Sequence, residues 1–134
     1  MDVVFLDVNV LFSAAYRPKA GLRRLWGLET ADLLSSSYAV EEARRNLSEP
    51  AQRKRLERLL RSTRIVPEHP EAGREQLSLQ KTGLPDKNLP ILAAAVGARA
   101  THLLTGDITH FGPLLGRNIA GVRVLTPAGY LRGH

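Results

Sequence analysis

The sequence predicts an α/β protein, a three-layer α/β/α sandwich with a central, mostly parallel five-stranded sheet. Short apolar runs alternate with helical patterns along the 134 residues, and this alternation is typical of parallel βαβ units. Two of the runs, Val3–Leu6 and Thr101–Leu104, lead directly into segments that carry an aspartate, as buried strands with polar ends do. No repeat, low-complexity tract or long linker divides the chain, which favours one domain over residues 1–134.

The strands are expected where short apolar runs are bounded by turn or capping residues. They are Val3–Leu6, Asp32–Ser36, Arg64–Val66, Thr101–Leu104 and Val122–Leu125. Helices are expected between the strands, where apolar residues recur at helical spacing. They begin near Val10, break near Pro18 and resume through Leu22 to Trp26, and then cover Tyr38–Leu47, Ala51–Arg61, Glu71–Lys81, the segment from Asn88 to Val96, Thr109–Leu115 and Pro127–Leu131.

Local signals justify these boundaries in chain order. Pro18 interrupts the first helix because proline lacks a backbone N–H. Pro50 suits the first turn of the helix that places Leu56, Leu59 and Leu60 on its inward face. Asn88 is a favoured N-cap, and Pro90 then falls in the first turn of its helix. Gly97 closes that helix near its C-cap.

Composition excludes several classes of protein. Hydrophobic residues make up 43% of the chain, which is enough for a packed core, and cysteine is absent, so neither disulfides nor thiolate metal sites are possible. No apolar run approaches the length of a membrane span, and the N-terminus lacks the pattern of a signal peptide. We therefore expect a cytoplasmic protein without a membrane partner.

The net charge of +6 and the pI of about 10.3 favour a polyanionic partner, usually nucleic acid. An arginine-biased genome would give the same balance, and only four of the 19 basic residues are lysines. Charge alone does not separate the two interpretations.

Acidic or amide residues lie at strand ends or helix starts in four places. These are Asp7, the pair Glu41 and Glu42, the segment Asp86–Asn88, and Asp107. Ligands of open parallel sheets bind at the carboxyl ends of the strands, and carboxylates gathered in one cleft repel each other unless a cation neutralises them. Because Mg²⁺ prefers oxygen ligands, the pattern predicts a divalent metal site.

Each of these residues also has a purely structural interpretation. Asp7 could cap a helix, and Asn88 could be only an N-cap. Glu41 and Glu42 could interact with the helix dipole, and being adjacent they point in different directions, so only one of them can face the site. Asp107 could be a turn residue beside Gly106. The four positions together are more convincing than any one of them.

The chain resembles the PIN-domain nucleases, the family that includes the VapC toxins of bacterial toxin–antitoxin pairs. Five segments carry the resemblance, in the family's order and over nearly the whole chain. They are Phe5–Leu11, Ser37–Ala43, Pro90–Ala95, Leu103–Asp107 and Val124–Ala128. The first and fourth segments are the more specific ones.

The resemblance implies a metal-dependent endoribonuclease, a hydrolase of RNA phosphodiesters that uses Mg²⁺ or Mn²⁺. It implies that Asp7, Glu42 and Asp107 are metal-site acids, with Glu42 preferred over Glu41 by spacing, and that Asn9 and Thr105 are polar supports. The family usually has an aspartate where this chain has Asn88. Asparagine keeps a carbonyl oxygen but loses the charge, so Asp86, two residues upstream, is an alternative metal ligand. The resemblance further implies a toxin with a cognate antitoxin and a homodimer.

Basic residues cluster on the predicted helix 51–61 and just after it. RNA contacts are expected from Arg53, Arg55, Arg58 and Arg61. The alternative is a solvated helix with one internal pair, Arg53 with Glu57.

Two other functions stay open. A catalytically weakened PIN-like module would bind RNA or protein without cutting, and Asn88 favours it. A HAD-type phosphatase also begins with a strand ending in aspartate, but that family generally has a second aspartate where this chain has Asn9. His110 lies near the predicted cleft and is a weaker candidate for a phosphate contact.

Overall fold

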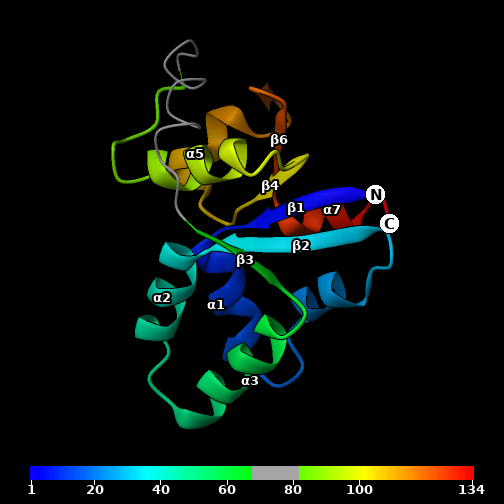
Figure 1. Ribbon diagram of the computed structural model, residues 1–134, viewed down its shortest axis with the longest axis vertical. Coiled ribbons are helices and arrows are strands. Elements are labelled where there is room, and N and C mark those ends of the chain that lie inside the picture. Colours follow the sequence, from blue (N-terminus) through cyan, green and yellow to red (C-terminus); the bar gives the residue numbers. More distant parts are fainter. Residues whose placement is uncertain (68–81) are drawn as a thin grey trace.

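A mostly parallel sheet forms the centre of the computed structural model, which describes residues 1–67 and 82–134 (Figure 1). Its strands are β1 (Asp2–Leu6), β2 (Ala31–Ser36), β3 (Arg64–Val66), β4 (His102–Leu104), β5 (Asn118–Ile119) and β6 (Val122–Leu125). The order across the sheet is β3-β2-β1-β4-β6-β5, and only the β5–β6 pair is antiparallel. The predicted α/β class is confirmed, and all five expected strands form.

The predicted strand count was wrong by one, because the described residues contain a sixth strand, β5. This strand has two residues, which is too short to show any periodicity in the sequence. It pairs with β6 through a hairpin whose turn residues, Ala120 and Gly121, have φ angles of 51° and 92°. Positive φ at both positions is typical of a type I′ turn. Such turns usually have the sequence Asn-Gly, whereas this one has Ala-Gly.

The helices largely follow the predicted order. The α-helices are α1 (Val8–Tyr16), α2 (Ser37–Asn46), α3 (Pro50–Leu60), α5 (Leu89–Gly97), α6 (Ile108–Phe111) and α7 (Pro127–Leu131), and the 3₁₀ helices are η1 (Gly21–Gly27) and η2 (Gly112–Leu114). The expected continuation of the first helix through Leu22 to Trp26 is therefore a separate 3₁₀ segment. The expected helix Glu71–Lys81 lies outside the described residues.

The order in which strands are added to the sheet reverses at the boundary between β1 and β4. From β1 it proceeds through α1 to β2 and through α2 and α3 to β3, and it then returns to β4 on the other side of β1. Helices α1, α2 and α3 lie on one face of the sheet and α5 lies on the other (Figure 1). In β1 and β4, Leu6 is in register with Leu104, so both strands end at the same level. Such a switch point is where α/β sheets bind ligands.

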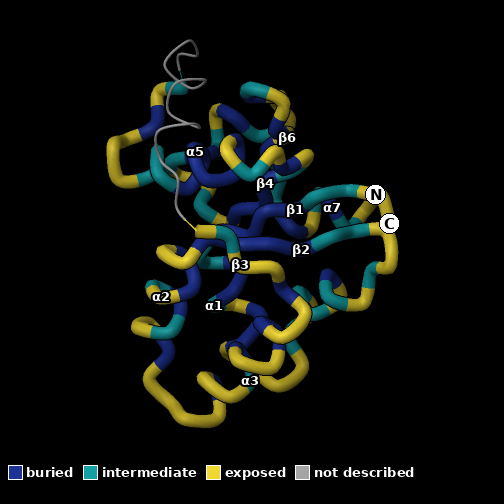
Figure 2. Tube along the Cα trace, viewed as in Figure 1, coloured by how far each residue is buried: buried dark blue, intermediate teal, exposed yellow. Residues whose placement is uncertain are grey.

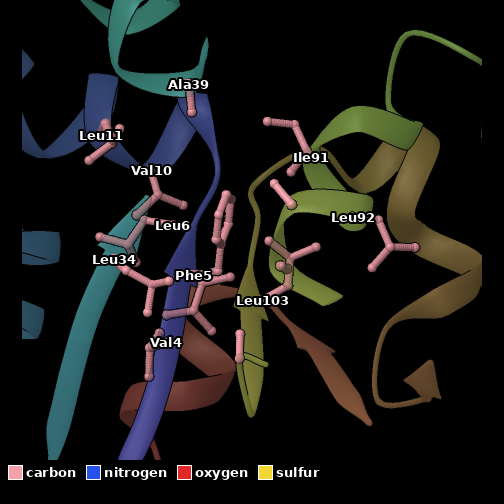
Figure 3. Packing of buried hydrophobic residues seen from close by; sticks show 14 of the residues in the cluster. Val4, Phe5, Leu6, Val10, Leu11, Leu34, Ala39, Ile91, Leu92 and Leu103 are labelled. Carbon is pink, nitrogen blue, oxygen red and sulfur yellow. The ribbon is translucent and has the colours of Figure 1, made fainter. Parts of the chain in front are cut away.

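The core surrounds β1, whose residues Val4, Phe5 and Leu6 have no exposed surface. Figure 3 shows apolar side chains of α1 and β2 on one side of this strand and those of α5 and β4 on the other. Figure 2 shows the same central strands as the most buried part of the trace. Burial on both faces explains why the strand is a continuous apolar run rather than an alternating one. Among the described helices, none combines the length and apolarity required to cross a bilayer.

Candidate metal centre

A cavity of about 470 Å³ opens where β1 and β4 end. It is lined by residues of the β1–α1 and β4–α6 junctions, of α1 and α2, and of the start of α5. These residues are Asp7, Val8, Asn9, Phe12, Tyr38, Asn46, Lys87, Asn88, Ile91 and Asp107. The fold therefore brings together four of the sequence-predicted site residues, Asp7, Asn9, Asn88 and Asp107.

Asp7 is the most buried acid of the cavity, with 5% of its surface exposed. It is the N-cap of α1, and its Oδ1 accepts a hydrogen bond from the backbone N–H of Val8 at 2.7 Å. Burial raises the pKa of Asp7, and the nearby charge of Asp107 raises it further, against the opposing effect of hydrogen bonds from Thr105, Val8 and Asn9. The capping role and a site role coexist, because Oδ2 faces other partners.

Two polar side chains fasten Asp7 to the end of β4. The Thr105 hydroxyl donates to Asp7 Oδ2 at 2.8 Å and accepts from the Asp107 N–H at 3.0 Å. Asn9 Oδ1 accepts from the Gly106 N–H at 2.8 Å, and its Nδ2 approaches Asp7 Oδ2 at 3.5 Å. A Cβ at Gly106 would lie 3.3 Å from Asn9 Oδ1, so the glycine permits this close approach.

Asp107 is held by the first turn of α6. Its Oδ1 accepts from the His110 N–H at 3.1 Å, and its Oδ2 lies 2.8 Å from His110 Nδ1. Desolvation by itself would raise the pKa of Asp107, but the hydrogen bonds from the His110 side chain and backbone outweigh it, so the pKa is lowered. The pKa values of the two carboxyls are therefore shifted in opposite directions, up for Asp7 and down for Asp107.

Asn88 is at the N-cap position of α5, but its side chain makes no capping bond. Its Nδ2 instead donates to Asp107 Oδ2 at 3.3 Å. Its Oδ1 is the single buried side-chain oxygen or nitrogen in the described part of the chain that has no hydrogen-bond partner. Such orphaned acceptors are rare in folded proteins and call for a ligand, water or ion.

The two glutamates of α2 point to different surroundings. Glu41 pairs with Arg44, which also binds Glu57 of α3, so Glu41 faces that helix. Glu42 lies four residues from both Tyr38 and Asn46, which line the cavity, and residues with this spacing share one face of a helix. The Glu42 carboxylate is paired with Arg45 at 2.9 Å and is not part of the cavity wall.

The predicted acidic cluster is smaller in the structure than in the sequence analysis. Asp7 and Asp107 converge, whereas Glu42 is paired with Arg45 and Asp86 is exposed and outside the cavity wall. Within residues 1–67 and 82–134, no three acidic or histidine side chains are arranged to bind one ion. Asp86 is close to Asn88 in sequence, but the turn at residues 86–88 directs the two side chains differently, and only Asn88 lines the cavity.

The donor set nevertheless fits a hard divalent cation. Two carboxylates, Asp7 and Asp107, and the unpartnered amide oxygen of Asn88 line one cavity. Mg²⁺ typically uses one or two carboxylates and fills its other positions with water and phosphate oxygens. A full protein cage is therefore not required.

The arginines of α3 mostly serve the fold. Arg53 Nε donates to the Leu47 carbonyl at the end of α2, and Arg55 donates to the carbonyls of Ala15 and Tyr16 at the end of α1. The expected pair of Arg53 with Glu57 is wrong, because Glu57 binds Arg44. The side chains of Arg58 and Arg61 are exposed and make no hydrogen bond to the described residues.

Sequence reasoning missed several residues of the cavity wall. Tyr38 and Asn46 could have been found from their spacing to Glu42, and Phe12 from its place on α1 one turn beyond Asn9 and Val8. Lys87 carried no signal except adjacency to Asn88. The bond between His110 and Asp107 follows from their separation of three residues at a helix start.

Comparisons with known proteins support the fold. No family model and no curated protein matches the sequence. Among solved structures, a chain of VapBC2 from Rickettsia felis, bound to a DNA fragment from their promoter, superposes with a TM-score of 0.67 and 16% identity, over 92% of this chain and 98% of that one. A chain of FitAcB from Neisseria gonorrhoeae superposes with a TM-score of 0.59 and 24% identity, over 93% and 98%. At these identities the likeness is one of fold.

Proposed function

We propose that this protein is a Mg²⁺- or Mn²⁺-dependent endoribonuclease of the PIN-domain type and the toxin of a toxin–antitoxin pair. The observation that carries the proposal is the meeting of Asp7, Asp107 and the unpartnered Asn88 Oδ1 in one cavity at the switch point of the sheet. This is the place and the ligand chemistry that hydrolysis of a phosphodiester by a metal-dependent enzyme requires.

Asp7, Asp107 and Asn88 would hold the ion, and Glu42 would join them after leaving Arg45. When bound, such an ion acidifies water and neutralises charge on the oxygens of the scissile phosphodiester. Asp7 is suited to this role because burial disfavours its charged carboxylate, and a bound cation would offset that electrostatic cost.

The neighbouring residues hold these ligands in place. Thr105 and Asn9 fix the orientation of the Asp7 carboxylate, and His110 fixes that of Asp107. Lys87 lines the same cavity and carries a positive charge that suits a phosphate. Because hydrogen bonds hold Asp7 and Asp107 before any substrate arrives, these two carboxylates need little rearrangement during the reaction.

RNA is the proposed substrate and a protein antitoxin the proposed partner. The chain carries a net charge of +6, and Arg58 of α3 and Arg61 directly after this helix are exposed. The structural neighbours come from VapBC2 and FitAcB, and complexes of this kind pair a toxin with its antitoxin. A homodimer is proposed only from the resemblance to the PIN-domain nucleases.

A binding module without cleavage is the second candidate, and Asn88 is the observation that favours it. An asparagine supplies one neutral oxygen where an aspartate would supply a charge. The weaker ion binding that follows would leave a protein able to bind RNA or a partner but slow to cut.

Cleavage of a labelled RNA with Mn²⁺ tests these alternatives. The natural chain should cut the RNA, Asp7→Asn should not, and Asn88→Asp should cut faster. If only Asn88→Asp cuts, the natural protein is a binding module. Asn118→Asp is the matched control, because Asn118 is distant in the sheet and its Oδ1 bond to the Gly121 N–H survives the change. A DNA of the same sequence and a small phosphomonoester test the choice of substrate, and hydrolysis of the monoester alone would favour a phosphatase.

A further inference from the structure

Strand β2 carries, one residue before its end, a serine with no exposed surface. Ser35 is 0% exposed and follows the buried Leu33 and Leu34. Burying a hydroxyl costs free energy unless it forms a hydrogen bond, and an apolar side chain would suit this position better by burial alone. Ser35 therefore needs a partner, and its hydroxyl donates to the Leu6 carbonyl of β1 at 2.7 Å.

The partner of Ser35 lies just beyond the paired part of β1 and β2. The last residues of these strands in register are Phe5 and Leu34, and Figure 3 shows the two strands side by side at Leu34. The Leu6 carbonyl therefore lies where the pairing between these strands stops. A buried backbone carbonyl needs a donor, and the Ser35 hydroxyl supplies one.

The peptide unit between Leu6 and Asp7 is held from both sides. Its carbonyl oxygen accepts from Ser35 of β2, and its N–H donates to the Leu104 carbonyl of β4 at 3.1 Å. In a trans peptide these two groups point in opposite directions, which matches the places of β2 and β4 on opposite sides of β1. Hydrogen bonds from two neighbouring strands thus fix the plane of this peptide.

The plane of this peptide governs where the Asp7 side chain points. Asp7 is the residue at which β1 gives way to α1, with a φ of −71° and a ψ of 164°. Because the peptide is planar, the direction of the Asp7 Cα–Cβ bond follows from the preceding plane and from φ. Thr105 then binds Oδ2 from the β4 side at 2.8 Å. Asp7 is thus tied to β4 through its N–H and its side chain, and to β2 through Ser35.

We propose that Ser35 is a positioning residue of the candidate metal centre, whose hydroxyl holds the Leu6–Asp7 peptide so that the Asp7 carboxylate faces Asp107 and Asn88. This inference rests on the proposed function, because it assigns a divalent ion to that cavity. Ser35 does not line the cavity, so it acts through Asp7 and not on the ion. Without its hydroxyl, the Leu6 carbonyl loses this donor and the peptide is free to rotate about its remaining bond to β4.

Binding of Mn²⁺ to the purified protein, measured from the electron paramagnetic resonance signal of the free ion, tests the role at the metal. Ser35→Ala should weaken Mn²⁺ binding roughly tenfold, at the lower end of the effects of outer-shell partners. Ser35→Thr keeps the hydroxyl and should retain most of the affinity. Ser35→Cys keeps a similar size with a weaker donor and should fall between Ser35→Ala and the natural chain.

Thr63→Val is the matched control for a general loss of stability. The Thr63 hydroxyl is also buried and donates to a carbonyl, that of Leu59, at 2.7 Å, but Thr63 lies outside the cavity wall. Both Ser35→Ala and Thr63→Val should lower the melting temperature, whereas only Ser35→Ala should weaken Mn²⁺ binding. Equal Mn²⁺ affinities of the two variants would overturn the proposal, since Ser35 would then serve the fold alone.

Hydrogen exchange of the metal-free protein examines the peptide directly. Ser35→Ala should speed exchange of the Asp7 amide relative to the Val4 amide of the same strand, because a rotating peptide weakens the N–H bond to Leu104. Thr63→Val should leave the ratio of the two exchange rates unchanged. An unchanged ratio in Ser35→Ala would show that its hydroxyl does not hold this peptide.

The two measurements separate failure of this proposal from failure of the proposed function. If the natural chain and Ser35→Ala bind Mn²⁺ equally well, the role of Ser35 is refuted while the metal centre stands. If the natural chain binds no Mn²⁺, the proposed function fails and with it the role of Ser35 at a metal. Faster exchange of the Asp7 amide in Ser35→Ala would then still assign the hold on the Leu6–Asp7 peptide to Ser35.

Discussion

The hydroxyl of Thr105 donates a hydrogen bond to Asp7 Oδ2 at 2.8 Å, although 98 residues separate the two in the chain. The Thr105 hydroxyl oxygen also accepts a hydrogen bond from the Asp107 N–H, and Thr105 is 1% exposed. One buried hydroxyl therefore joins the two acids of the candidate metal centre. It links the Asp7 side chain to the Asp107 backbone at the ends of the paired strands β1 and β4.

Thr105→Val should destabilise the protein by about 1–3 kcal/mol, because it leaves a buried carboxylate oxygen and a backbone N–H without their partner. It should also weaken Mn²⁺ binding, since Asp7 loses the contact that orients it. Thr105→Ser keeps the hydroxyl and should retain metal binding. Thermal denaturation with and without Mn²⁺ measures both effects, and equal Mn²⁺ stabilisation of the valine and serine variants would refute the orienting role.

Asp7→Asn should abolish cleavage yet raise the melting temperature of the metal-free protein. The loss of activity should exceed the roughly 10- to 100-fold that loss of an outer-shell partner of a metal costs. The gain in stability follows because burial raises the pKa of Asp7 above its ordinary value of 3.8, so the charged form opposes folding at neutral pH.

The pH dependence of this effect has a definite sign. A carboxyl with a raised pKa favours the folded state when it is protonated. Its contribution to the free energy of unfolding is complete below the ordinary pKa and is lost as the pH rises through the pKa of the folded state. The melting temperatures of the natural chain and Asp7→Asn should therefore coincide at acidic pH and separate as the pH rises, with Asp7→Asn the more stable at pH 7. If the metal-free natural chain is as stable as Asp7→Asn at pH 7, or more stable, then burial of the charged Asp7 carboxylate does not destabilise the fold.

Glu42→Gln should reduce cleavage, and the adjacent Glu41→Gln is its matched control. Glu42 lies on the helical stripe of Tyr38 and Asn46, whereas Glu41 is engaged with Arg44. We expect a loss of about tenfold or more for Glu42→Gln. The stability of either variant should change by less than about 1 kcal/mol, because each ion pair has one partner that is more than half exposed. If the two variants lose equal activity, Glu42 has no particular role at the metal.

Replacing both Arg58 and Arg61 by glutamate should weaken RNA binding and reduce its salt dependence. Neither guanidinium bonds to the described part of the fold, so stability should change little. Each lost phosphate contact should lower the slope of log K against log salt by about 0.7 for a single strand. Arg55→Ala should instead destabilise the fold, because Arg55 binds the final carbonyls of α1. Binding that is unaffected at every salt concentration would remove α3 from the RNA surface.

Ala120→Asn should stabilise the protein by about 0.5–1 kcal/mol. Ala120 has a φ of 51° in the β5–β6 turn, a conformation that asparagine adopts more readily than alanine. Denaturant unfolding measures the change. Ala120→Val should be destabilising in the same assay, since a β-branched side chain is the least compatible with positive φ.

Several features follow from the sequence because their causes are local. The strands β1, β2, β3, β4 and β6 are short apolar runs that parallel packing buries on both faces, and this pattern survives any tertiary arrangement. The aspartates after β1 and β4 follow in the same way, since a carboxylate cannot continue a buried strand. Strand β5 escaped prediction because two residues carry no period.

Tertiary contacts alone decided what the polar side chains do. Asn88 is a favoured N-cap residue type, but its amide N–H₂ donates to Asp107 instead, and its Oδ1 has no hydrogen-bond partner among the described residues. Glu42 is held by Arg45, and Arg55 is drawn to the end of α1 rather than to solvent. A polar side chain has several partners of similar energy within reach, so its choice depends on which groups the packed strands and helices bring beside it.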